Sequence, residues 1–223
     1  MDRETPPVRL EPREPPRSAI VWLHGLGADG HDFEPLAEQL RLPEALGVRY
    51  VFPHAAPRPV TVNGGMVMRA WYDILEIELG RRVDEAAIEA SVAAVTELVE
   101  REIESGIPAE RLVLAGFSQG GVIALNAGLR MPVRLAGVIG LSSYLPGGEA
   151  LAARRDPANA ATPVFLGHGR HDPVVPLALG QAARDAIAGF GNPLTWREYP
   201  MEHAVCMDEI DDLRGWLGDV LGR

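Results

Sequence analysis

Short runs of apolar residues alternate along this chain with longer segments whose apolar residues have helical spacing. Each short run has the length of a strand, and most runs are apolar throughout rather than at every second position. That pattern is typical of strands buried on both faces of a parallel sheet. The runs that we expect to be strands are Ser18–Leu23, Arg49–Pro53, Arg111–Phe117, Leu135–Ser142, Pro163–Gly167 and Leu194–Tyr199.

The clearest helix lies between the second and third of these runs. Asp84 can cap its start and Gly106 can end it. Apolar residues recur between them at helical spacing, at Ile88, Val92, Val95, Val99 and Ile103. Further helices are expected directly after Ser118, over about Leu177–Phe190 and over about Asp208–Leu221. Strands that alternate with helices predict an α/β fold, with a mostly parallel twisted sheet and helices on both faces.

The chain is long enough for one compact domain with a sizeable core. It has 223 residues, of which 47% are hydrophobic and 23% charged, as in soluble globular proteins. Residues 1–17 contain five prolines and no apolar core of a signal peptide, so we expect an extended N-terminal arm on the surface. Residues 18–223 are expected to form a single domain. No apolar run is long enough to span a bilayer, so stable membrane insertion is not expected.

The net charge bears on the possible binding partners, and the cysteine content bears on the cellular compartment. The formal net charge of −10 argues against nucleic acid, which this charge would repel. The single cysteine, Cys206, excludes an internal disulfide and fits a reducing compartment, so a cytoplasmic location is expected. Cys206 is expected to be a small packing residue rather than a nucleophile, since no helix N-terminus or cationic partner is evident beside it.

A candidate nucleophile lies between a predicted strand and a predicted helix. The segment Gly116-Phe117-Ser118-Gln119-Gly120 is a G-x-S-x-G sequence, in which the serine stands on a sharp, strained turn. Glycines on either side let strand and helix approach closely. The turn would expose the Ser118 hydroxyl and point the Gln119 backbone N–H at a developing oxyanion. Chance matches in this strand–helix context are rare, so we predict Ser118 as the nucleophile.

A serine nucleophile needs a base and a carboxylate that orients it. Histidine suits neutral pH, and the order in α/β-hydrolases is Ser, then Asp or Glu, then His. Asp172 follows the predicted strand Pro163–Gly167, and only His203 lies after Asp172 among the histidines. We therefore predict His203 as the base and Asp172 as its orienting carboxylate.

Other interpretations of these residues remain open. Asp172 precedes a proline and could simply begin a turn, and His203 could be an ordinary loop histidine. Asp156 is a weaker rival for the orienting carboxylate. His168 and His171 could bind a metal, but no third ligand is suitably spaced, so we interpret them as residues that shape a loop and expect no metal site.

The first predicted strand leads into a glycine-rich loop. Gly25, Gly27 and Gly30 match G-x-G-x-x-G, the dinucleotide-binding pattern. Such a site also needs an acidic residue at the end of the next strand, and the strand ending at Pro53 has none. In α/β-hydrolases this loop supplies the second oxyanion donor, for which the Leu26 backbone N–H is the candidate.

Several segments together resemble one family. They are His24–Gly30, Pro59–Gly65, Trp71–Ile74, Gly116–Gly121 and Gly169–Pro176, with His203. They resemble the carboxylesterase/acyl-protein thioesterase family of α/β-hydrolases, and bacterial carboxylesterases in particular. The resemblance runs from about Ser18 to Trp216 and leaves the arm outside.

The resemblance implies an α/β-hydrolase fold without a large cap domain and without a cofactor. It also implies a triad of Ser118, Asp172 and His203, with the N–H groups of Leu26 and Gln119 as the oxyanion hole. The family usually has glycine directly before the histidine. Here that residue is Glu202, which could restrict the loop or favour the charged imidazole.

The implied activity is hydrolysis of small-molecule esters or thioesters. The segment Val60–Ile74 resembles a family loop beside the acyl site, where Met66, Met68 and Trp71 could line a substrate groove or merely pack the core. We predict a serine carboxylesterase for short- to medium-chain esters. Alternatives are acyl-protein thioesterase, lysophospholipase or amide hydrolysis, a non-catalytic binding module, and dinucleotide binding. The sequence is compatible with a homodimer.

Overall fold

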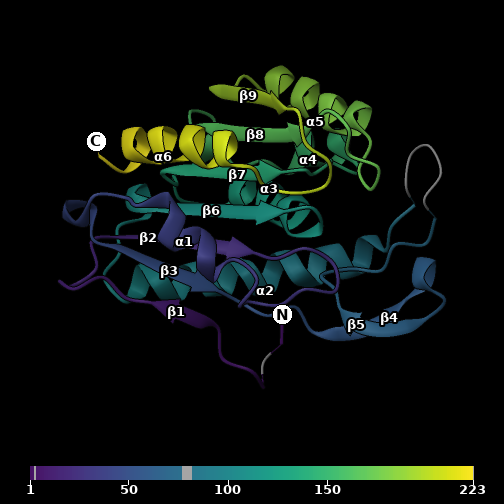
Figure 1. Cartoon of the computed structure of the whole chain (residues 1–223), viewed down its shortest axis with the longest axis horizontal. Helices are drawn as coiled ribbons and strands as arrows, with labels where there is room; N and C mark the ends of the chain where they lie inside the picture. Colours follow the sequence, from purple (N-terminus) through teal and green to yellow (C-terminus); the bar gives the residue numbers. More distant parts are fainter. Residues whose placement is uncertain (3, 77–81, 223) are drawn as a thin grey trace.

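The computed structural model describes residues 1–2, 4–76 and 82–222, and a seven-stranded sheet forms its centre (Figure 1). The strands of this sheet are β1 (Val8–Leu10), β2 (Ser18–Leu23), β3 (Val48–Phe52), β6 (Leu112–Phe117), β7 (Gly137–Leu141), β8 (Val164–Gly169) and β9 (Leu194–Tyr199). Their spatial order is β1-β3-β2-β6-β7-β8-β9. Only β1 runs antiparallel to its neighbour, so the mostly parallel sheet predicted from the sequence is confirmed.

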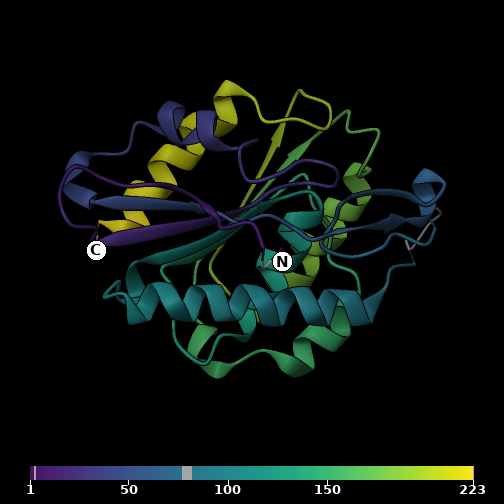
Figure 2. The ribbon, with the colours of Figure 1, turned by 90° about the horizontal axis from the view of Figure 1, so that it is seen from below.

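Helices cover both faces of the sheet, as Figure 2 shows from below. The helices are α1 (Glu34–Leu40), α2 (Glu85–Glu104), α3 (Gln119–Arg130), α4 (Gly148–Arg154), α5 (Leu177–Phe190) and α6 (Met207–Leu221). Side chains of α1 and α6 belong to one apolar cluster, and those of α2 to α5 belong to another on the opposite face. No helix in the described residues is both long and apolar enough to cross a membrane.

The α2 helix shows how local sequence sets an element. The Asp84 side chain caps its start by accepting a hydrogen bond from the Ala87 N–H at 3.0 Å. Ile88, Val92 and Val99 face the core, as their spacing predicts. The predicted helix is therefore confirmed, and the other three predicted helices and six predicted strands agree with the structure to within a few residues.

The N-terminal arm contributes to the sheet. Val8–Leu10 form the edge strand β1 against β3, with Val8 opposite Phe52. Arg9 reaches Glu102 of α2, whose side chain is 1% exposed. The sequence predicts an arm on the surface but not β1, because three residues flanked by prolines carry no clear period.

A second, two-stranded sheet lies between β3 and α2. It is a hairpin of β4 (Pro57–Val60) and β5 (Met66–Arg69). Gly64 and Gly65 both have positive φ, 67° and 77°, in the tight turn that joins the two strands. Prolines at alternate positions hide β4 from a pattern search, and a two-stranded edge sheet tolerates them.

Candidate active site

Ser118 occupies the turn between β6 and α3. Its φ of 53° and ψ of −118° are strained for a residue with a side chain. A methyl group at Gly116 would collide with the main chain of Gly120, so glycine at both positions permits the sharp turn. The Ser118 N–H donates to the Leu141 carbonyl at 2.8 Å, and the Ser143 hydroxyl donates to the Ser118 carbonyl at 2.9 Å. The turn is thus held from the end of β7.

Asp172 and His203 are hydrogen-bonded to each other. His203 Nδ1 lies 2.7 Å from Asp172 Oδ2, and the Asp172 residue is 7% exposed. The other carboxylate oxygen accepts from the N–H groups of Val174 and Val175, both at 2.8 Å. Asp172 therefore begins a turn and also holds the histidine.

The protonation states follow from these contacts. Burial alone would raise the pKa of Asp172, but the hydrogen bonds from His203 and from the Val175 and Val174 amides outweigh it and lower that pKa. An ionised Asp172 can only accept, so Nδ1 of His203 carries the proton and Nε2 is left as the basic atom. The Phe117 ring packs against the imidazole, with ring centroids 4.8 Å apart.

The glycine-rich loop after β2 lies beside the serine. A methyl group at Gly25 would be 3.6 Å from Ser118 Cβ. His24 anchors the loop, since Nδ1 bonds the Gly25 carbonyl at 2.7 Å while Nε2 accepts from the Ala55 N–H at 3.0 Å. Burial lowers the pKa of His24 to about 4, so this ring is neutral. Leu26 faces the same cavity as Gln119, the first residue of α3, where N–H groups lack an acceptor inside the helix.

The Gln119 side chain has a role that the sequence analysis missed. Its Oε1 accepts from the Trp71 N–H at 2.8 Å, and its Nε2 donates to the Tyr72 carbonyl at 2.7 Å. Trp71 Nε1 in turn donates to the His24 carbonyl at 2.9 Å. These bonds tie the segment before α2 to both loops of the proposed oxyanion hole. A glutamine inside G-x-S-x-G was the only signal for this contact.

A cavity of about 270 Å³ connects these groups. Ser118, Gln119, His203 and Leu26 line it. The rest of its lining is mainly apolar and comes from Gly25, Ala28, Asp32, Tyr72, Ile74, Phe117, Tyr144 and Val174. The site therefore combines a serine, a histidine bonded to a buried carboxylate, and an apolar chamber.

The suggested groove residues lie elsewhere. Met66, Met68 and Trp71 are not part of the described lining of this cavity. Trp71 is fully buried and supports the loops, while Met66 is 63% exposed on β5. Met68 accepts a hydrogen bond from Asn63 within the hairpin, at 3.3 Å to its Sδ. Met66 and its neighbour Val67 are both exposed, so this end of the hairpin faces solvent, and within the described lining of the cavity the apolar side chains include Tyr72, Ile74 and Tyr144.

Comparison with known proteins gives the family. The model of the phospholipase/carboxylesterase family matches residues 6–220. The chain belongs to this family. Its match includes β1, which lay outside the resemblance seen in the sequence.

Relatives of this phospholipase/carboxylesterase member cover nearly all of it. Acyl-protein thioesterase 1 of Neurospora crassa is 40% identical over 215 residues, covering 92% of this chain and 88% of the relative. Among solved structures, Arabidopsis thaliana SOBER1 has a TM-score of 0.87 at 31% identity, covering 92% of this chain and 99% of that one. Acyl-protein thioesterase 2 of Zea mays has a TM-score of 0.85 at 31% identity, covering 97% and 99%. The chain is therefore an α/β-hydrolase of a family named for phospholipases and carboxylesterases, and two of these relatives are named acyl-protein thioesterases.

The rival residues have structural places in this family member. His168 is buried, its Nε2 lies 2.8 Å from the Val175 carbonyl, and burial lowers its pKa. His171 is exposed, and in the described ranges no three metal-binding side chains cluster. Asp156 caps a short turn by accepting from the Ala158 N–H at 2.8 Å.

Glu202 and Cys206 lie close to His203 in the sequence. Glu202 is exposed, and its main chain packs closely over Gly169. Cys206 directly precedes α6, so the expectation that no helix N-terminus lies beside it is wrong. Its thiol is half-buried and gives that N-terminus no side-chain cap. The helix begins at Met207, one residue earlier than the predicted start at about Asp208. The predicted start had left Cys206 separated from the helix.

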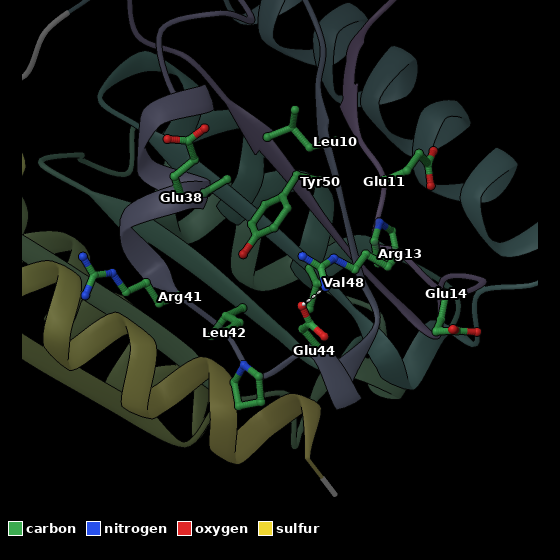
Figure 3. A pocket seen from close by; sticks show the side chains of 13 residues that line it. Leu10, Glu11, Arg13, Glu14, Glu38, Arg41, Leu42, Glu44, Val48 and Tyr50 are labelled. Carbon is green, nitrogen blue, oxygen red and sulfur yellow. Dashed lines mark ion pairs between the residues drawn. The ribbon is translucent and has the colours of Figure 1, made fainter.

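A second cavity, of about 300 Å³, lies on another part of the molecule (Figure 3). It opens between the chain after β1, the end of α1 and side chains of β3, and Tyr50 of β3 points into it. Its polar lining is Glu11, Arg13, Glu14, Glu38, Arg41 and Glu44 together with Tyr50. Its described lining contains no serine, cysteine or histidine, so it offers none of the groups of a Ser-His pair.

Proposed function

We propose that this chain is a serine carboxylesterase that cleaves short- to medium-chain carboxylic esters, and thioesters, through an acyl-enzyme on Ser118. The observation that carries this proposal is the 2.7 Å bond between His203 and Asp172, in a loop that faces the same cavity as Ser118. It supplies a histidine in the tautomer that can accept a proton.

The proposed reaction has two halves. His203 Nε2 takes the Ser118 proton as the serine oxygen attacks the acyl carbon, and then gives that proton to the departing alcohol or thiol. In the second half, water attacks the acyl carbon while His203 accepts its proton and then returns a proton to Ser118. This step releases the acid and restores the serine. The N–H groups of Leu26 and Gln119 stabilise the oxyanion in both halves.

The cavity supports the size of the acyl group. Its lining is mainly apolar, and each methylene buried there contributes about 0.8 kcal/mol. A volume of about 270 Å³ holds a short or medium chain and leaves a longer one partly in water. No separate cap lies over it in the described residues.

The proposal is tested by covalent labelling. A fluorophosphonate should modify the wild-type protein on one peptide, the one that contains Ser118, and Ser118→Ala should abolish both labelling and turnover while leaving the thermal unfolding temperature nearly unchanged. Ser105→Ala, at the end of α2, is the control and should be labelled and turn over substrate as wild type does. Labelling of another residue would refute the assignment.

Acyl-protein thioesterase activity is the second candidate, because relatives carrying that name match at 35 to 40% identity. The same acyl group presented as an S-acyl cysteine peptide and as a simple alkyl ester separates the two. A preference of kcat/KM for the peptide thioester would favour the second candidate. Lysophospholipid hydrolysis, a homodimer and a cytoplasmic location remain predictions from the sequence.

A further inference from the structure

Glu209 is a carboxyl group enclosed in the protein core. It lies in the first turn of α6 and is 0% exposed. Neither of its side-chain oxygens has a hydrogen-bond partner among the described residues. Buried polar groups are nearly always bonded, because an unpaired one loses its water without compensation. This side chain therefore calls for a specific explanation.

The carboxyl lies over the strand that leads to Asp172. It packs on the Cα of Gly167 in β8, where any side chain would overlap it. Gly167 is level with Leu141 in β7, which is level with Phe117 in β6. Phe117 packs against the His203 ring. Glu209 and the proposed base therefore rest on the same level of the sheet, on the face that α6 covers.

The surroundings of Glu209 disfavour its charged form. Burial and, next, repulsion from Asp212 raise the pKa of Glu209 to about 8. From α6 the facing group is Asp212, and from β9 it is Tyr199, whose hydroxyl donates to Asp212 at 2.9 Å. Arg197 of β9 forms an ion pair with Asp212, with 3.4 Å between Arg197 Nε and Asp212 Oδ2. No described cation bonds Glu209 itself.

We propose that Glu209 is a positioning residue for His203, acting as an uncharged carboxylic acid that keeps the first turn of α6 seated on Gly167. The inference rests on the proposed function, which assigns His203 as the base. Ionising Glu209 places a charge where nothing balances it, and water can reach it only if α6 moves off β8. Because α6 continues directly from the His203 loop, the imidazole then leaves its place beside Ser118.

The test compares pH profiles of kcat. Glu209→Gln keeps the size of the side chain and cannot ionise. Wild-type kcat should fall about tenfold or more between about pH 7 and pH 9.5, following loss of the carboxyl proton, while KM changes little. In Glu209→Gln the fall should be absent, with kcat at pH 7 within about twofold of wild type. Asp208→Asn, an exposed neighbour on the same turn, is the matched control and should fall as wild type does.

A second measurement uses only the wild-type protein, in case Glu209→Gln does not fold. The infrared band of a protonated carboxyl should be present at neutral pH and disappear over the same pH range as kcat. An equal alkaline fall in Glu209→Gln, a flat wild-type profile, or a carboxyl already ionised at neutral pH would overturn the inference. If neutral-pH esterase activity and fluorophosphonate labelling are both missing, the proposed function fails and this inference fails with it. If both are normal, the pH profiles test the role of Glu209 alone.

Discussion

The Gln119 side chain binds the main chain of Trp71: Gln119 Oε1 accepts a hydrogen bond from the Trp71 backbone N–H at 2.8 Å, and the bond is buried. The residue next to the proposed nucleophile thus has two tasks. Its backbone N–H is assigned to the oxyanion, and its side chain fixes the segment that carries Tyr72 into the substrate cavity.

Gln119→Ala should therefore weaken both stability and substrate binding. The change removes the hydrogen bonds that Gln119 makes to the Trp71 N–H and to the Tyr72 carbonyl, at a cost of about 1–3 kcal/mol in the free energy of unfolding. The cavity wall should also loosen, so that KM rises while the acyl-enzyme still forms. Denaturant unfolding and ester kinetics measure the two effects. A Gln119→Ala protein as stable as wild type would argue against both bonds.

Asp172→Asn should lower kcat far more than it lowers stability. The asparagine oxygen can still accept from the Val174 and Val175 amides, which preserves the turn. Its NH₂ group cannot accept the His203 Nδ1–H, so the ring adopts the other tautomer and no longer presents a basic Nε2. A loss of about 10⁴ in kcat is expected by analogy with serine proteases. Retention of more than about a tenth of the wild-type kcat would remove Asp172 from the triad.

Glu102 should contribute stability that depends on pH. Burial alone would raise the pKa of Glu102, but hydrogen bonds from Arg9 and Arg49 hold it below its ordinary value of 4.5. A carboxyl with a lowered folded-state pKa stabilises the fold above pH 4.5 and loses that contribution as the pH falls through the folded value.

Glu102→Gln should accordingly destabilise the protein by about 1–3 kcal/mol at pH 7. The difference from wild type should shrink as the pH falls below about 4.5. Thermal unfolding of both proteins across this range is the measurement, and a difference that stays constant would show that the Arg9 and Arg49 contacts do not depend on the charge of Glu102.

Acyl-chain preference should follow the volume of the cavity. For aryl esters, kcat/KM should rise from acetate, peak at about four to ten carbons and then fall as further methylenes stay in water. Emulsified long-chain triglycerides should be poor substrates. Ala28→Phe, which adds a ring at the half-exposed edge of the cavity, should move the peak to shorter chains. An unmoved peak would place the acyl chain outside this cavity.

The sequence predicted the parts of this site that depend on chain order and local turns. G-x-S-x-G locates Ser118, and strand ends locate Asp172 and His203, because parallel strands bring their carboxyl ends to one edge. The places of Trp71 and Gln119 could not be predicted. A tryptophan beside a glycine-rich hairpin can face a groove or the core, and only the fold decides which side of the chain is buried.

The unpaired carboxyl of Glu209 was equally invisible. Its residue type and helical position are those of an exposed acid in the first turn of a helix, where acids are common. Only the packing of α6 on β8 shows that this position meets Gly167. The short strand β1 was missed for a related reason, since its pairing with β3 depends on contacts distant in sequence.

An acyl-enzyme on Ser118 can be trapped and located by rapid-quench mass spectrometry. Wild-type protein mixed with an activated medium-chain ester is quenched in acid, weighed intact and then digested. We expect one added acyl group, located on the peptide that contains Ser118, and its absence in Ser118→Ala. An acyl group on Cys206, or turnover with no acyl-protein under conditions that trap acyl-enzymes, would contradict it.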